Sequence, residues 1–236
     1  MDASRLTTLL LGSALALAVP HGLAAQTRND SGLWLGVIST GRFAPAGSEV
    51  GNFRWWLEAQ DRQRDEGQHF DLGFVRPGLG YALTDRVTVW AGYGYFLSDP
   101  VGRAPFEEHR VWQQVTWSAP VAGLTLQSRT RLEERFVETG SDTGWRVRQM
   151  VKATLPVTHR GQLFLSVWDE GFFDANDTDW GQRQGFRQNR AFAGLGAFFD
   201  EAHTKSVEIG YVNQWIDRPG RDAMNHALVV WFFLNF

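Results

Sequence analysis

The chain has 236 residues, 43% of them hydrophobic and 21% charged, and its formal net charge at pH 7 is −3. No basic surplus points to nucleic acid as a partner, and a chain of this length suits a single all-β domain. Cysteine is absent, so disulfide bonds do not hold the fold together.

The first 25 residues have the pattern of a secretory signal peptide. Arg5 lies in a short N-terminal region, residues 6–19 are uncharged and mostly apolar, and small residues follow at Gly22, Ala24 and Ala25. The apolar run is shorter than the roughly 20 residues that a membrane-spanning helix needs. We therefore expect residues 1–25 to be removed on export and 26–236 to form the mature domain. A retained anchor is the alternative.

Aromatic abundance and overall polarity occur together in the rest of the chain. It contains 11 Trp and 17 Phe, yet the mean hydropathy is −0.28. A transmembrane β-barrel explains both, because its strands alternate lipid-facing apolar residues with polar lumen residues and its rims carry aromatic girdles. No window after the signal reaches 18 apolar residues, so any span must be a strand.

Runs with strand composition follow one another along the chain. In order, they are 32–42, 53–60, 68–83, 86–98, 107–118, 124–136, 145–155, 162–173, 187–199, 205–216 and 224–236. The run 124–136 alternates clearly, with Leu126 and Leu132 on one face and Arg129, Arg131 and Glu133 on the other. This period of two indicates strands rather than helices.

The links between these runs form a short and a long set. The short links are 84–86, 119–123, 158–161 and 200–205, and the long ones are 62–67, 99–106, 138–143, 174–186 and 217–223. Bacterial barrels have short periplasmic turns, long outer loops and an even number of strands. We therefore predict a closed antiparallel barrel of about ten strands beginning near residue 52, with 32–42 as an extra segment, or alternatively twelve strands.

The last run ends the chain on an aromatic residue. Leu228, Val230, Phe232, Leu234 and Phe236 occupy every second position. This ending resembles the signal of outer-membrane barrels, which implies that Phe236 is recognised by the barrel-insertion machinery. A soluble sandwich that ends in Phe is the alternative.

Charged residues on the predicted inner face define a lumen charge ladder. Its members are Arg54, Glu58, Arg110, Gln114, Arg129, Arg131, Glu133, Arg135, Arg146, Arg148, Lys152, Arg190 and Glu208. An Arg or Lys facing lipid at mid-bilayer would cost roughly 2–4 kcal/mol. We expect these side chains to fill the lumen as a hydrogen-bonded plug. The alternative is a path that attracts anions, because Arg binds phosphate and carboxylate groups bidentately.

An acidic cluster lies in and beside the predicted outer loop 174–186. It comprises Asp169, Glu170, Asp174, Asn176, Asp177 and Asp179. Oxygen ligands at this spacing suit calcium, but the helix-loop-helix pattern is missing and acidic loop residues are usually solvated or turn-forming. We assign no metal and no cofactor to the chain.

Three histidines are expected near the outer rim: His69, His109 and His226. Ser98, Ser141, Asp71 and Glu108 are possible partners in a hydrolytic site. No sequence phrase places a nucleophile beside its base, so we assign no catalytic residue.

Several phrases resemble a family of bacterial outer-membrane barrels known only as a domain of unknown function. They are RPGLGY at 76–81, EHRVWQQ at 108–114, SRTRLE at 128–133, WDE at 168–170 with NDTDW at 176–180, QNR at 188–190 and LNF at 234–236. The resemblance covers nearly all of the mature chain. It implies a barrel and supplies no activity, substrate or catalytic residue.

These patterns predict an outer-membrane barrel of a Gram-negative bacterium, exported through the periplasm and handled there by chaperones and the insertion machinery. Its expected role is structural or interactive, with a charged, plugged lumen in contact with no nucleic acid and surrounded by outer-membrane lipid. A narrow anion-preferring channel and a rim hydrolase acting on lipid or envelope substrates are the alternatives. The sequence leaves the oligomeric state open.

Overall fold

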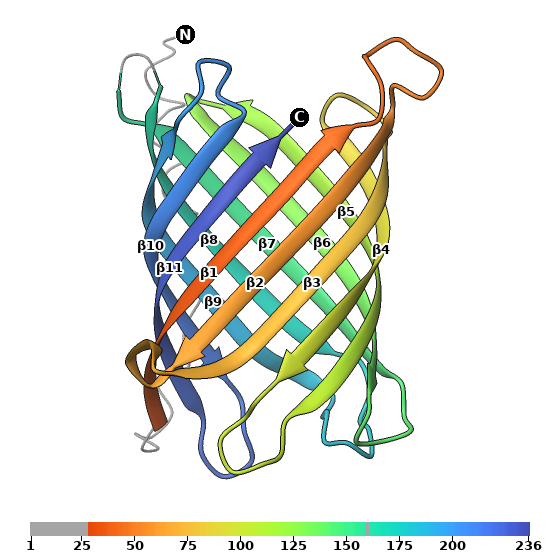
Figure 1. The fold of residues 1–236 in the computed structure, drawn as a ribbon, viewed down its shortest axis with the longest axis vertical. Coiled ribbons are helices and arrows are strands. Elements are labelled where there is room, and N and C mark those ends of the chain that lie inside the picture. The colour runs from red at the N-terminus through yellow and green to blue at the C-terminus, as the bar shows by residue number, and fades with distance from the viewer. Residues whose placement is uncertain (1–27, 159–160) are drawn as a thin grey trace, which may run out of the picture.

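A computed structural model describes residues 28–158 and 161–236, and this part of the chain forms a closed β-barrel (Figure 1). The signal peptide predicted at 1–25 lies outside the described residues. The strands are β1 (Arg28–Arg42), β2 (Phe53–Arg64), β3 (His69–Ala82), β4 (Val87–Ser98), β5 (Phe106–Val121), β6 (Leu124–Val137), β7 (Gly144–Pro156), β8 (Leu163–Asp174), β9 (Gly185–Phe198), β10 (Lys205–Ile216) and β11 (Ala223–Asn235). One 3-10 turn, Asp65–Gly67, follows β2.

The barrel closes through a parallel pair of strands. Consecutive strands pair antiparallel, whereas β1 pairs parallel with β11 from Arg28 opposite Ala223 to Thr40 opposite Asn235. The described barrel therefore has eleven strands, and the prediction of ten or twelve is wrong. An even number is required only when the first and last strands close antiparallel, and residues 32–42 belong to a full barrel strand.

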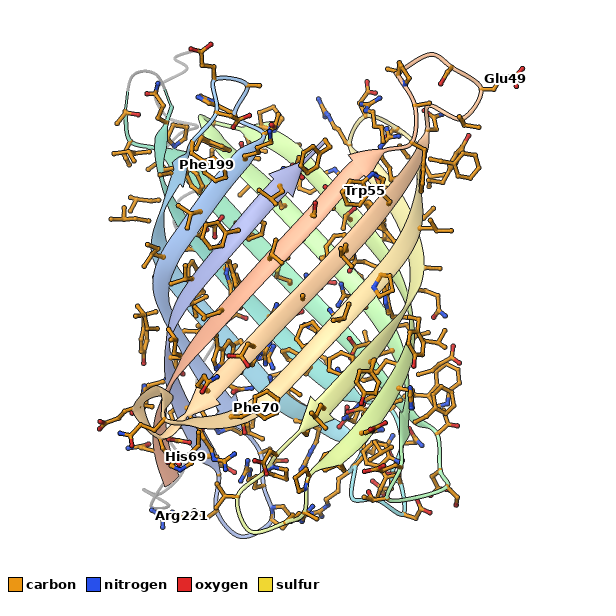
Figure 2. The ribbon with its side chains drawn as sticks, viewed as in Figure 1. Glu49, Trp55, His69, Phe70, Phe199 and Arg221 are labelled. Atoms are coloured by element: carbon orange, nitrogen blue, oxygen red, sulfur yellow. The ribbon has the colours of Figure 1, made fainter. Side chains whose placement is uncertain are left out.

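The two ends of the barrel carry different connections. The links 83–86, 122–123 and 199–204 lie at the end where β11 finishes, together with the longer link 43–52 (Figure 1). The loops 99–105, 138–143, 175–184 and 217–222 lie at the opposite end, where β1 begins. We call these the C-terminal end and the loop end. Figure 2 places Trp55 and Phe199 near the C-terminal end and His69 and Phe70 near the loop end.

Side chains alternate between the inside and the outside along each strand. In β6, Arg131 and Glu133 are fully buried, whereas their neighbour Phe136 is 40% exposed on the outer face. The outer face carries exposed aliphatic side chains on every side, including Leu79 on β3, Val151 on β7 and Leu195 on β9. Polar residues at this surface hydrogen-bond one another. These bonds join Gln149 to Ser128 and Thr130, Asn189 to Asp169, and Tyr211 to His226.

Large aromatic rings pack inside the barrel against glycines of neighbouring strands. A Cβ atom at Gly78 or Gly92 would lie 2.5 Å from the ring of Trp112, and one at Gly210 would lie 2.7 Å from Phe192. Glycine at these positions leaves room for a flat ring over the backbone. The rings therefore fill the lumen close to the wall.

No helix in the described residues is long and apolar enough to cross a membrane.

Candidate functional site: the barrel lumen

A continuous network of ion pairs covers the lumen wall from β2 to β8. Glu133 lies at its centre: its carboxylate accepts hydrogen bonds from Arg148 at 2.8 Å and Arg110 at 3.2 Å. Arg148 also donates to Glu170 at 2.9 and 3.0 Å, and Arg110 donates to Glu108 at 2.7 Å. Each carboxylate is shared by two or more arginines, so the side chains form one connected unit rather than separate pairs.

Further pairs extend this network to the edges. Arg76 donates to Glu58 at 2.9 Å, Arg135 to Glu108 at 2.6 Å and Arg129 to Glu170 at 2.8 Å. Arg146 forms a separate pair with Asp174 at 2.6 Å. We call the wall formed by these residues of β2–β8 the charged wall. Its guanidinium groups also lie over inward aromatic rings; Arg110 is 3.8 Å from the centre of Phe96 and Arg148 is 4.6 Å from that of Phe172. Such contacts add cation–π attraction to the ion pairs.

The remaining members of the predicted ladder have varied surroundings. Lys152 pairs with Glu208, which also accepts from Ser166 at 2.9 Å. Arg54 lies at the C-terminal end and donates to the backbone carbonyls of Gly51 and Phe53. Gln114 accepts a hydrogen bond from Arg131 at 2.7 Å. Arg190 lies over the rings of Trp34 and Phe172.

Sequence reasoning missed three charged members of the lumen in addition to Glu170 and Asp174, which it placed in the acidic cluster. Arg62 was assigned to an outer link and Arg76 to no site, and Glu108 was considered only as a rim catalyst. All three are buried inside the barrel at 6%, 2% and 2% exposure. The alternation of β2 would have found Arg62, because it continues the inward series of Glu58 and Gln60. Arg76 follows the same rule in β3.

The opposite wall of the lumen carries an apolar cluster. Its buried cluster joins side chains of β1, β8, β9, β10 and β11, namely Trp34, Trp168, Phe192, Val212, Ala227, Val229 and Trp231. Trp168 stacks on Phe192 at 5.4 Å and on Trp231 at 5.6 Å between ring centres. We call this surface the aromatic wall.

A cavity of about 580 Å³ lies between the two walls. Residues from both ends line it, among them Asp85 and Arg86 at the C-terminal end and Asp71 and Arg218 at the loop end. Several buried donors lack a hydrogen-bond acceptor within the described part of the chain, including both terminal nitrogens of Arg131, Nε2 of Gln114 and Nε1 of Trp56. All the unsatisfied side-chain atoms are donors. The lumen therefore offers more hydrogen-bond donors than acceptors.

The structure divides the predicted acidic cluster. Glu170 and Asp174 lie on the inner face of β8 and pair with arginines, while Asp169 lies on the outer face and accepts from Asn189. Only Asn176, Asp177 and Asp179 belong to the loop 175–184. Among the described residues, no group of three or more His, Asp or Glu is arranged to hold a metal ion.

Asp179 joins two loops at the mouth of the loop end. Its carboxylate accepts hydrogen bonds from the backbone of Ser141 at 2.8 Å, the hydroxyl of Ser141 at 2.9 Å and the backbone of Asp142 at 3.1 Å. These bonds, first of all that from the Ser141 backbone, lower the pKa of Asp179 below its ordinary value. In the same loop, Gln182 is buried and accepts from Arg135 at 3.0 Å. The loop 175–184 is thereby tied to the charged wall.

The candidate hydrolytic residues do not come together. His109 and His226 face outward and hydrogen-bond the tyrosines Tyr93 and Tyr211, and His69 contacts Asp65 at 3.0 Å. Among their proposed partners, Ser141 donates to Asp179 and Glu108 accepts from Arg110 and Arg135. The geometry gives none of these histidines a serine nucleophile.

The C-terminal residue is held at the seam between β1 and β11. The backbone nitrogen of Phe236 donates to Thr40 at 2.9 Å, and its carbonyl accepts from Arg42 at 3.0 Å. The ring stacks against Trp55 at 6.0 Å and is 64% exposed. The side chain thus remains accessible on the outer surface.

The comparisons with known proteins give a family through its family model, and they supply no activity. The family described as protein of unknown function (DUF2490) matches residues 31–225. An uncharacterized protein of Methylorubrum extorquens is 32% identical over 212 residues, which cover 89% of each chain. Among solved structures, outer-membrane expressed OmpT of Vibrio cholerae is similar, with 12% identity and a TM-score of 0.39 over 71% of this chain. The chain spans 57% of that structure's length.

Proposed function

The chain belongs to the family of proteins of unknown function DUF2490, and we propose that it is an outer-membrane β-barrel whose lumen is closed by a charged network. In this proposal residues 1–25 are cleaved on export, residues 26–236 form the barrel, and Phe236 is the signal for the insertion machinery. The barrel has a structural or interaction role in the outer membrane of a Gram-negative bacterium.

The outer surface of the barrel is the observation that carries this proposal. Exposed aliphatic side chains encircle the strands, and aromatic residues lie toward both ends, with Phe53 and Trp117 near the C-terminal end and Phe136 and Trp145 near the loop end. An aliphatic band between two aromatic girdles is the outer surface of a transmembrane barrel. A soluble protein rarely exposes a continuous apolar surface of this size.

Substitution at mid-strand tests the membrane contact. Val167 lies near the middle of β8 and is 50% exposed. Val167→Arg should destabilise the folded barrel in lipid bilayers by roughly 2–4 kcal/mol, measured by urea unfolding, because Arg at mid-bilayer is costly. The matched control is Val101→Arg in the loop 99–105, where Val101 is 54% exposed. Equal stability of the two variants would contradict a membrane-facing β8, because exposed substitutions in soluble proteins usually change stability by about 0.5 kcal/mol or less.

The natural absence of cysteine makes labelling a direct test of localisation and orientation. Short turns face the periplasm in bacterial barrels, so a membrane-impermeant maleimide should label Gly220→Cys on intact cells. Glu201→Cys, in the exposed turn 199–204, should react only after the outer membrane is permeabilised. Labelling of neither variant on intact cells but of both after permeabilisation would place the protein away from the cell surface.

The ion-pair network supports a lumen that is closed to ions. The cavity, which residues from both ends line, favours a second candidate function, a narrow anion-preferring channel. Conductance in planar bilayers separates the two. A closed lumen predicts no channel openings at any salt concentration, whereas a reversal potential that follows the anion gradient would establish the channel. Discrete openings without anion preference would contradict both.

A further inference from the structure

Two arginines lie together in the lumen near the loop end, on either side of the boundary between the two walls. Arg62 from β2 and Arg190 from β9 both lie over the indole ring of Trp34, 4.0 and 5.1 Å from its centre. Arg62 is only 6% exposed, and both side chains line the cavity. The chain thus holds two like charges close together beside the cavity inside the barrel.

Neutral amides, rather than carboxylates, are the hydrogen-bond partners of these two arginines. Arg62 donates to the amide oxygen of Gln60 at 2.8 and 3.3 Å. With its amide oxygen turned toward the guanidinium, Gln188 accepts from Arg190 at 2.6 and 2.8 Å. An amide oxygen satisfies an N–H donor but leaves the positive charge uncompensated.

The nearby carboxylates are engaged by other cations. Glu170 pairs with Arg148 and Arg129, and Asp71 lies 3.9 Å from Arg64. No ion pair within the described residues includes Arg62 or Arg190. The carboxylates of the charged wall, from Glu58 to Asp174, each have at least one arginine partner.

A buried charge without a paired carboxylate destabilises a fold, and a sequence that retains such a charge beside a second, partly buried one usually does so for a function. Two planar guanidinium groups with additional amide donors offer several N–H groups at once, which suits an oxyanion whose oxygens accept hydrogen bonds. We propose that Arg62 and Arg190, supported by Gln188 and the neighbouring Gln214, form a binding site for a phosphate-class oxyanion that enters the lumen from the loop end.

The position of the cavity supports this direction of entry. Arg218, in the loop 217–222, lines the same cavity at its mouth. A positive charge there attracts an anion toward the inner pair. Both ends of the cavity carry mixed charges, with Asp71 near Arg218 at the loop end and Asp85 beside Arg86 at the far end. The direction of entry therefore rests on the inner arginine pair, which lies nearer the loop end.

Calorimetric titration with inorganic phosphate tests the site in the full-length barrel refolded in detergent, at constant ionic strength set by chloride. The wild type should bind phosphate saturably. Arg62→Gln and Arg190→Gln should each weaken that affinity by about tenfold or more, because a charge-assisted hydrogen bond contributes about 1.5–3 kcal/mol. The control Arg86→Gln removes one charge from the other end of the same cavity, and its affinity should stay within about threefold of the wild type.

The same variants provide a readout that a purely structural role would not give. In chloride alone, Arg62→Gln should be as stable as the wild type or more stable, since it removes a buried like-charge repulsion. Loss of phosphate binding together with unchanged stability supports the site. No saturable binding by the wild type, or an equal loss in Arg86→Gln, would overturn it.

A second arm of the experiment identifies the source of the oxyanion. Mixed detergent micelles containing phosphatidylcholine, with and without phosphatidylglycerol, are added as competitors of bound phosphate. A soluble oxyanion predicts that phosphatidylglycerol competes weakly, whereas strong competition would assign the site to a lipid headgroup and overturn entry from solution. Because binding is measured in detergent, its failure leaves the proposed outer-membrane location untouched.

Discussion

The two walls of the lumen fill the same barrel by opposite means. On the charged wall, fully buried Glu133 and Arg131 are surrounded by further arginines and carboxylates. On the aromatic wall, Val212 and Val229 are equally buried, but their neighbours are rings and aliphatic groups. Buried ions depend on every partner being present, whereas apolar contacts contribute separately and in proportion to the area they bury. The walls should therefore respond differently to the loss of one side chain.

The largest effect is expected at the centre of the charged wall. Glu133→Ala leaves Arg148 and Arg110 without their shared carboxylate, and Arg76 and Arg131 lose a partner at 3.7 and 3.8 Å. Breaking a buried pair in this way costs about 3–5 kcal/mol. Unfolding in urea, monitored by the gel shift between folded and heated protein, measures the loss.

Glu133→Gln separates charge from shape at the same position. The amide keeps the size of the side chain but removes its negative charge, so most of the destabilisation should remain. A cost of less than about 1 kcal/mol for both variants would show that the network contributes no more than an exposed ion pair.

A smaller effect is expected on the aromatic wall. Val212→Ala removes two methyl groups from a side chain with 0% exposure beside Phe192 and Trp231. The transfer and cavity terms together predict a loss of about 2 kcal/mol. This loss of stability should be the same at low and high salt. The effect of substituting an arginine that lines the cavity should instead depend on salt. A cost as large as that of Glu133→Ala would mean that the two walls are equally cooperative.

Much of the barrel is predictable from the sequence because period-two alternation is a local property. The alternation in 124–136 assigns Arg129, Arg131 and Glu133 to one face, and the structure places all three in the lumen. The number of strands is not local, since it depends on how β1 meets β11 across the seam, and parallel closure leaves no sign within either strand. The eleven runs were visible, but the even-number rule removed one of them.

The candidate site was only partly predictable, for a related reason. Alternation places Arg190 and Gln188 on the same inward face, but nothing in the local sequence says whether a carboxylate of another strand pairs with Arg190. The position of Arg62 and Arg190 over Trp34 joins β1 and β2 with β9, which is distant from them in the chain. Which charges are compensated follows from the closed barrel and cannot be read from any single strand.

The smallest effect is expected for a carboxylate outside both walls, which sharpens the contrast between buried and exposed charge. Asp179 is exposed, and its hydrogen bonds from Ser141 and Asp142 lower its pKa. Because the pKa of Asp179 is lower in the folded than in the unfolded protein, its contribution to the stability of the loop contact is fully present above the unfolded pKa and is lost as the pH falls through the folded pKa.

Acidification below about pH 4 should therefore release the contact between loops 138–143 and 175–184 while the buried pairs persist. In acid, the hydrogen-exchange rates of the Ser141 and Asp142 amides in the wild type should rise toward the rates of the same amides in Asp179→Asn. The rates in that variant should change little further with acid. Unaltered protection of these amides in both proteins would mean that Trp180, whose indole donates to Asp142 at 2.8 Å, holds the loops together without the carboxylate.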